Sequence, residues 1–91
     1  MSPSDFDAAW TSAARRSLNR LPEKIATAVV EFVYGSLAAN PPRVGKPLKL
    51  HLEGLHSARR GDYRVIYRIH DAERRVDVIA VEHRSDAYRP H

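Results

Sequence analysis

The sequence predicts a small α+β fold in which an N-terminal strand and a helical hairpin pack on an antiparallel β-sheet. Three observations predict it. The chain has 91 residues, which suffices for one compact domain with one modest core, so we expect a single domain spanning 1–91. Apolar residues recur at helical spacing in the first half, whereas from Arg43 onward the segments alternate or run β-branched between turn residues. Helices followed by consecutive strands are typical of the α+β class.

The N-terminal part is expected to begin with a short edge strand at 6–11, followed by a first helix. Thr11 or Ser12 is a suitable N-cap, because a hydroxyl at that position accepts a hydrogen bond from the first turn. Along the helix, apolar residues recur at the spacing that places them on one side: Ala14, Leu18 and Leu21.

A second helix is expected from Pro22, which suits an opening turn, to about residue 39. Gly35 weakens its interior, and the run Asn40-Pro41-Pro42 ends it. One apolar stripe is predicted to form its buried side: Ile25, Val29, Phe32, Val33 and Leu37.

The second half is expected to form three strands joined by short turns. Strands are predicted at 50–58, 63–70 and 75–82, with turns at 60–62 and 71–74. Short turns make neighbouring strands antiparallel, and the N-terminal strand would pair at one edge. Tyr63 and Tyr67 share one strand face with Val65 and Ile69, which favours the core for both tyrosines.

Charge is distributed unevenly along the chain. The formal net charge is +4; residues 1–42 carry four basic and four acidic side chains, whereas residues 43–91 carry eleven and seven. Such a one-sided basic surface attracts polyanions, although a solvated basic face with no ligand is the alternative. The sequence has no cysteine, no apolar run long enough to span a membrane and no leader pattern, so we expect a cytoplasmic protein without disulfides.

Two basic clusters contain tyrosine or histidine. Residues 59–68 read RRGDYRVIYR, and residues 83–89 read HRSDAYR. Together with GLHSARRGDYRVIY at 54–67 and the order strand, two helices and three strands, they resemble the RelE/ParE toxin superfamily, and its RelE branch most closely, over about 7–89. The resemblance implies a toxin of a type II toxin–antitoxin pair that cleaves messenger RNA in the ribosomal decoding site. It also implies a RelB-like antitoxin as partner, with operator DNA bound only through the antitoxin complex.

Metal-independent RNA cleavage proceeds by in-line attack of a ribose 2′-OH on the adjacent phosphorus, so the enzyme must stabilise charge and move protons. A planar guanidinium grips phosphate oxygens at two points, which suits Arg64 and Arg84 as transition-state clamps. Arg59 and Arg60 are expected to hold flanking phosphates. The alternatives are that Arg64 only decorates an open sheet face and that Arg84 forms an ion pair with a nearby carboxylate.

The remaining catalytic roles fall to an aromatic and a titratable residue. Tyr88 offers a ring for stacking on a splayed base and a hydroxyl for alignment, unless it packs over the sheet edge. His83 is the natural proton carrier, because imidazole titrates near neutral pH; the alternative is a solvent-exposed histidine at a strand end. We expect neither a metal nor a cofactor, because no histidines are spaced with carboxylates as a zinc site requires.

The chain departs from the RelE pattern where that branch carries lysines, since Leu55 and Ser57 occupy those places. Lys46 and Lys49 are the candidate replacements that would bind RNA, and Glu53 is a further candidate base. Two other functions remain open: a ParE-type toxin that poisons DNA gyrase without cutting RNA, and a basic RNA-binding domain with no activity.

Overall fold

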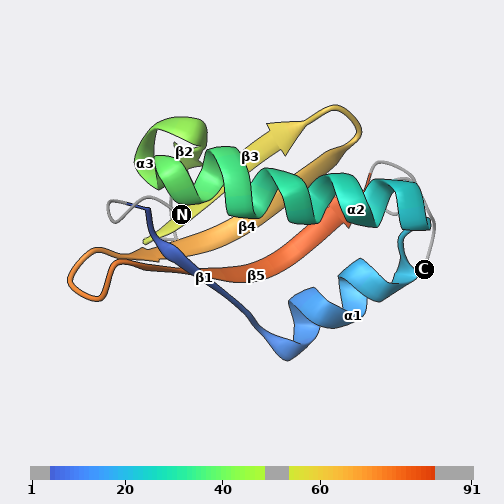
Figure 1. The fold of residues 1–91 in the computed structure, drawn as a ribbon, viewed down its shortest axis with the longest axis horizontal. Coiled ribbons are helices and arrows are strands. Elements are labelled where there is room, and N and C mark those ends of the chain that lie inside the picture. Colours follow the sequence, from blue (N-terminus) through green and yellow to red (C-terminus); the bar gives the residue numbers. More distant parts are fainter. Residues whose placement is uncertain (1–4, 49–53, 84–91) are drawn as a thin grey trace.

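The fold was analysed in a computed structural model, which describes residues 5–48 and 54–83. Within these residues the elements follow one another in this order (Figure 1): β1 (Asp7–Trp10), α1 (Ser12–Arg20), α2 (Glu23–Phe32), the π-helix η1 (Val33–Leu37), α3 (Pro41–Val44), β2 (Lys46–Pro47), β3 (Leu55–Arg60), β4 (Tyr63–His70) and β5 (Arg75–His83). No helix within these residues has the length and apolar character needed to cross a membrane.

The strands form one five-stranded sheet in the order β1-β5-β4-β3-β2. Helix α2 crosses one face of this sheet, and α1 lies beside β5 (Figure 1). The predicted α+β arrangement of strand, helical hairpin and sheet is therefore confirmed. The sequence predicts no direction for the N-terminal strand; in the structure β1 runs parallel to β5, whereas the other pairs are antiparallel. Two strands joined by a tight turn must run antiparallel. All the other elements separate β1 from β5 in the sequence, so no tight turn sets the relative direction of these two strands.

The N-terminal strand and helix form where the sequence predicts them. The Thr11 side chain accepts a hydrogen bond from the backbone N–H of Ala14 at 3.1 Å, which confirms Thr11 as the N-cap. The same hydroxyl donates to the backbone oxygen of Ile79 at 3.0 Å. A single side chain thus caps α1 and ties its start to β5.

The second helix begins after Pro22 and keeps helical backbone as far as Ala39, as predicted. Its last turns widen into the π-helix η1, which contains Gly35. The sequence pattern does not predict the short helix α3, because two consecutive prolines indicate only the end of a helix. Pro41 instead occupies the first helical position, where its missing N–H costs nothing.

The two hairpins differ in how closely they match the prediction. Strand β4 has the predicted bounds, and the turn at 71–74 is confirmed. Strand β3 extends to Arg60, which pairs with Tyr63, so the turn shortens to two residues, with Gly61 at φ +57°. The predicted start of this strand at residue 50 falls in 49–53, outside the described residues, and β2 is an additional short strand beside it.

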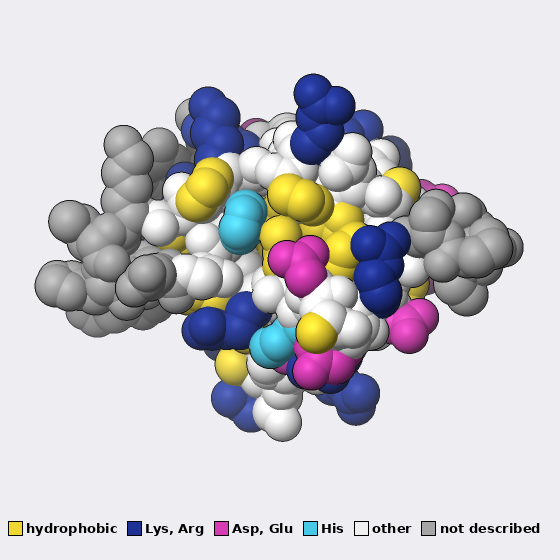
Figure 2. All heavy atoms as spheres, turned by 90° about the vertical axis from the view of Figure 1, so that its left-hand side faces the viewer, with side chains coloured by type: hydrophobic (Ala, Val, Ile, Leu, Met, Phe, Trp, Pro, Cys, Tyr) yellow, Lys and Arg dark blue, Asp and Glu magenta, His cyan; other side chains and the backbone are white. Residues whose placement is uncertain are grey.

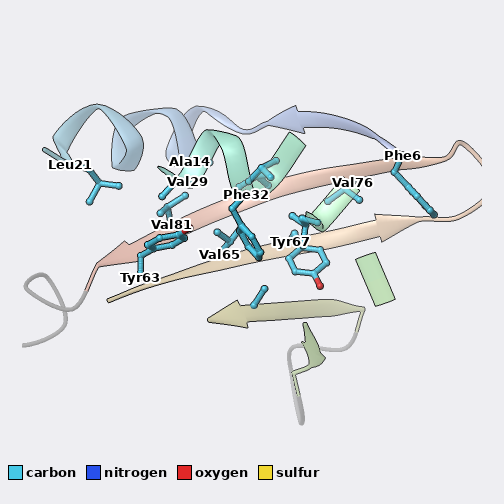
Figure 3. Close-up of a cluster of buried hydrophobic side chains, with 14 residues drawn as sticks. Phe6, Ala14, Leu21, Val29, Phe32, Tyr63, Val65, Tyr67, Val76 and Val81 are labelled. Carbon is cyan, nitrogen blue, oxygen red and sulfur yellow. The ribbon is translucent and has the colours of Figure 1, made fainter. Parts of the chain in front are cut away.

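The core lies between the helices and one face of the sheet (Figure 3). Tyr67 is fully buried, and its hydroxyl donates to the backbone oxygen of Pro41 at 2.6 Å. Tyr63 is also buried, which confirms both tyrosines as core residues. The apolar stripe of the second helix contributes further buried side chains: Val29, Phe32, Val33 and Leu37.

Candidate functional site

The two faces of the sheet carry different side chains. In β4, the residues at alternate positions from Tyr63 to Ile69 point into the core, whereas Arg64 and Arg68 are exposed. We call the side that carries Arg64 and Arg68 the open face, because among the described elements the helices pack on the opposite side (Figure 1).

A row of three charged residues crosses the open face, and we call it the arginine row: Arg59 of β3, Arg64 of β4 and Glu82 of β5. These residues are direct cross-strand partners, so their side chains lie on the same face. Nη1 of Arg64 lies 3.8 Å from Oε1 of Glu82, and the two side chains are 48% and 54% exposed. The contact is longer than a hydrogen bond, so this pair is a loose surface ion pair.

A second row lies one step further along the strands. Lys46 of β2 is the cross-strand partner of Ser57, and Ser57 is the partner of Ile66 in β4. Lys46 is exposed, whereas Ser57 and Ile66 are partly buried. Because alternate residues of a strand are ~7 Å apart, a cation and a partly apolar floor lie next to the arginine row.

A β-bulge decides which residue of β5 faces Arg64. Tyr67 pairs with Val78, but Ile66 pairs with Ala80, so one residue of β5 is left out of the ladder. This shift places Glu82 opposite Arg64 and His83 opposite Tyr63, on the helix side. The Nε2 atom of His83 is buried. His83 and Arg64, both predicted as catalytic residues, therefore lie on opposite sides of the sheet, because the bulge turns His83 to the helix side and Glu82 to the open face.

Arg60 also lies on the helix side. It is the cross-strand partner of Tyr63, and its guanidinium carbon stands 5.2 Å from the centre of the Phe32 ring. Burial raises the pKa of Tyr63, and the positive charge of Arg60 partly offsets that rise. The structure thus separates Arg60 from Arg59, although the two are adjacent in sequence.

The far end of the open face holds a second charged cluster around Asp77. Its Oδ1 accepts a hydrogen bond from Nε of Arg75 at 2.9 Å, and its Oδ2 lies 2.9 Å from Nε2 of His70. The bond from Arg75 and, to a smaller extent, the contact with His70 lower the pKa of Asp77, against an opposing effect of burial. Figure 2, which faces the left-hand side of the view in Figure 1, shows acidic, basic and histidine side chains interspersed there. Among the described residues, no three His, Cys, Asp or Glu side chains gather as metal ligands would.

The remaining predicted site residues, Arg84, Tyr88 and Lys49, lie outside the described residues, as does Glu53. Within the described ranges, the open face brings together Arg59, Arg64 and Lys46 from the predicted set. Sequence reasoning missed Glu82 as a member of this site. The sequence offers one sign of the position of Glu82: the apolar run at 78–81 breaks the alternation of polar and apolar residues, as happens where a strand contains a β-bulge.

A five-stranded sheet with helices on one side and exposed arginines on the other describes a class of small basic α+β proteins. Comparison with known proteins identifies the family. The family model described as the ParE toxin of the type II toxin–antitoxin system parDE matches residues 8–88. Toxin RelE of Mycobacterium tuberculosis is 60% identical over 84 residues, which cover 92% of this chain and 87% of the relative. Toxin RelG of the same organism is 52% identical over 80 residues, covering 88% and 92%.

A solved structure agrees with these sequence relatives. The toxin–antitoxin complex RelBE2 from Mycobacterium tuberculosis contains a chain that superposes with a TM-score of 0.88 at 47% identity, covering 93% of this chain and 98% of that chain. The chain therefore belongs to the RelE/ParE family of type II toxin–antitoxin toxins. The matched relatives carry RelE-type names, whereas the family model carries the ParE name.

Proposed function

We propose that this toxin is a metal-independent endoribonuclease that cleaves messenger RNA on the ribosome and thereby inhibits translation in the cytoplasm. The observation that carries the proposal is the arginine row, in which Arg59 and Arg64 are direct neighbours on the open face. Two adjacent guanidinium groups suit a phosphodiester whose charge grows in the transition state. The 60% identity to a protein named Toxin RelE supports the RelE-type activity over other activities on this fold.

Arg64 is proposed as the main phosphate clamp. Its present partner is the loosely held Glu82, and exposed ion pairs of this kind are worth only about 0–1 kcal/mol, so RNA displaces it at little cost. Arg59 would bind the same or the neighbouring phosphate, and Lys46 the RNA backbone one row away. Each of these groups is a permanent or near-permanent cation, so together they position the strand and stabilise charge.

Five further residues belong to the predicted site. Arg84 is proposed as the second clamp and Tyr88 as the stacking or aligning group, with Lys49 as a further backbone contact. Arg60 stands on the helix side, so we expect it to contribute less than Arg64. His83, considered above as the proton carrier, faces the same side as Tyr63, and we expect its substitution to slow cleavage less than that of Arg64.

A RelB-like antitoxin is the proposed protein partner, because the solved relative with a TM-score of 0.88 is a toxin–antitoxin complex. An acidic or amphipathic segment of the antitoxin would cover the open face, where its carboxylates meet the arginine row. Operator DNA would then be bound only through the complex.

The proposal is tested by adding the purified toxin to ribosomes programmed with a defined messenger and mapping the cleaved ends. Cleavage products ending in a 2′,3′-cyclic phosphate are expected, with no requirement for added divalent metal beyond that which holds the ribosome together. Arg64→Ala should slow single-turnover cleavage by at least about tenfold, which corresponds to ~1.4 kcal/mol of transition-state stabilisation. Arg16→Ala removes an exposed arginine of α1 instead and serves as the matched control.

The ParE-type function is the second candidate, and the description of the matching family model favours it. A gyrase poison would leave messenger intact on programmed ribosomes and produce gyrase-linked DNA breaks in cells. That pair of results would refute the endoribonuclease proposal. Binding to programmed ribosomes without any cleavage would instead point to the non-catalytic RNA-binding domain.

A further inference from the structure

We infer that Glu82 is the general base of the cleavage reaction, accepting the proton of the attacking ribose 2′-OH. This inference rests on the proposed endoribonuclease function. It starts from a gap in the site: arginine and lysine supply charge, but a guanidinium stays protonated and does not accept a proton. A base must therefore come from another side chain on the same face as Arg64.

The position of Glu82 satisfies this requirement. The β-bulge places it directly opposite Arg64, and its Oε1 lies 3.8 Å from Nη1 of that residue. An RNA phosphate held by Arg64 would bring its neighbouring 2′-OH within a few ångströms of the carboxylate, which is the reach that a general base needs. Arg59 lies on the other side of Arg64 and adds a second positive charge, so the arginine row keeps a net positive charge when the Glu82 carboxylate is ionised.

The three histidines of the described residues are less suited. His83 lies on the helix side, opposite Tyr63. His56 is the cross-strand partner of Tyr67 and stacks on its ring at 5.6 Å between ring centres, which also places it on the helix side. His70 lies on the open face, but at six residues from Arg64 along β4 it is roughly 20 Å away.

Of the two carboxylates that β5 places on the open face, only Glu82 is available to a substrate. Asp77 has both oxygens engaged at 2.9 Å, by Arg75 and His70. Glu82 makes only the 3.8 Å contact with Arg64 within the described part of the chain, and its side chain is 54% exposed. Asp77 is therefore held as a structural acceptor, whereas an oxygen of Glu82 is accessible to a hydroxyl of the substrate.

The proposed step conserves atoms and charge. Glu82 takes the proton as the O2′–H bond breaks, and the O2′ electron pair forms a bond to phosphorus while Arg64 holds the non-bridging oxygens. The bond from phosphorus to O5′ then breaks, and the leaving oxygen takes a proton from solvent water. The products are a 2′,3′-cyclic phosphate and a 5′-hydroxyl, and Glu82 returns its proton to solvent.

The test uses single-turnover cleavage on programmed ribosomes with four toxins: wild type, Glu82→Gln, Glu82→Ala and the control Glu31→Gln. Glutamine keeps the size and the contact with Arg64 but does not take up the proton, so we expect cleavage to slow by about 100-fold or more, within the range of general-base effects. Binding to the ribosome should stay within about threefold of wild type, since the carboxylate is assigned no share of binding. Glu31 is exposed on α2 and not on the open face, so its variant should cleave at the wild-type rate.

Rescue separates a chemical role from a structural one. Added formate should restore cleavage to Glu82→Ala, because a small carboxylate enters the vacated space, but not to Glu82→Gln, whose amide fills it. Cleavage by Glu82→Gln within threefold of wild type, or faster than wild type, would overturn the assignment; the second result would mean that Glu82 restrains Arg64. The proposed function fails separately, if wild-type toxin leaves the messenger intact.

Discussion

Gly45 precedes β2 and is packed so tightly that a single added methyl group should destabilise the fold. A Cβ built there would stand 2.7 Å from the backbone oxygen of Ser57 and still closer to the hydroxyl of Tyr67. The backbone at Gly45 is extended, with φ −115° and ψ −174°, so alanine adopts it without strain and the whole penalty is steric. Neither neighbour yields easily, because Ser57 presents strand backbone and the Tyr67 ring is fully buried.

The magnitude for Gly45→Ala follows from these contacts. Overpacking of a well-filled site costs about 1–3 kcal/mol. Displacing the Tyr67 hydroxyl from Pro41, which it contacts at 2.6 Å, adds about 1–3 kcal/mol for a buried acceptor left unpaired. The unfolded chain loses entropy on Gly→Ala, which returns about 0.4–1 kcal/mol. We therefore expect the free energy of unfolding to fall by about 3 kcal/mol, or roughly 12–24 °C in Tm for a domain of this size.

The assay is thermal and urea unfolding followed by circular dichroism, with two comparison variants. Gly35→Ala is the control, because nothing lies within 4 Å of a Cβ there, and it should stabilise by up to about 1 kcal/mol. In a Tyr67→Phe background the closest contact is gone, so Gly45→Ala should cost clearly less than in wild type. A Gly45→Ala protein within about 0.5 kcal/mol of wild type, or equal costs in both backgrounds, would refute the packing argument.

Three further predictions concern titration and the two faces of the sheet. Burial raises the pKa of Tyr67 to about 12, against a smaller opposing hydrogen bond from the backbone of Gly45. Since the unfolded tyrosine titrates near ~10, stability should decline by up to ~2.7 kcal/mol as pH rises from about 10 to about 12, and urea midpoints of Tyr67→Phe should lack this decline. Asp77 has a lowered pKa, so its effect on stability runs the other way: its stabilising contribution is present at neutral pH and is lost as the pH falls below ~4. In thermal melts, Asp77→Asn should therefore match wild type only in acid. Arg60→Ala should reduce ribosomal cleavage less than Arg59→Ala, because the two side chains lie on opposite faces; an equal loss in matched single-turnover assays would contradict this division.

The sequence predicted most of the fold because its local signals agree with the tertiary structure. Thr11 caps α1, Pro22 precedes α2, and β4 begins and ends at the predicted residues. Each difference between prediction and structure has its own physical cause. Pro41 and Pro42 end one helix and also begin α3. A proline is suitable for both positions, so the sequence pattern does not show that a new helix starts there. The two-residue turn at Gly61 shortened because Arg60 joined the ladder, which depends on pairing across strands.

The candidate site was less predictable than the fold. Alternation along β4 correctly placed Tyr63 and Tyr67 in the core and left Arg64 exposed, since a strand with one buried face has period 2. Adjacent arginines were assigned one role, although the same alternation puts Arg59 and Arg60 on opposite faces. The sequence alone therefore predicts that Arg59 and Arg60 lie on opposite faces, but only the tertiary packing shows which of these faces the helices cover.

By itself the sequence determined the α+β class, the basic second half and the family resemblance, because these depend on composition, periodicity and short motifs. Only the tertiary structure decided which residue of β5 meets Arg64. If the register set by the His70–Arg75 pair continued without a bulge, Val81 would be the cross-strand partner of Arg64. Because of the bulge near Ile66, Glu82 is that partner instead, and His83 faces the core side. A shift of one residue exchanges the two faces of a strand, and long-range packing, not local sequence, sets that shift.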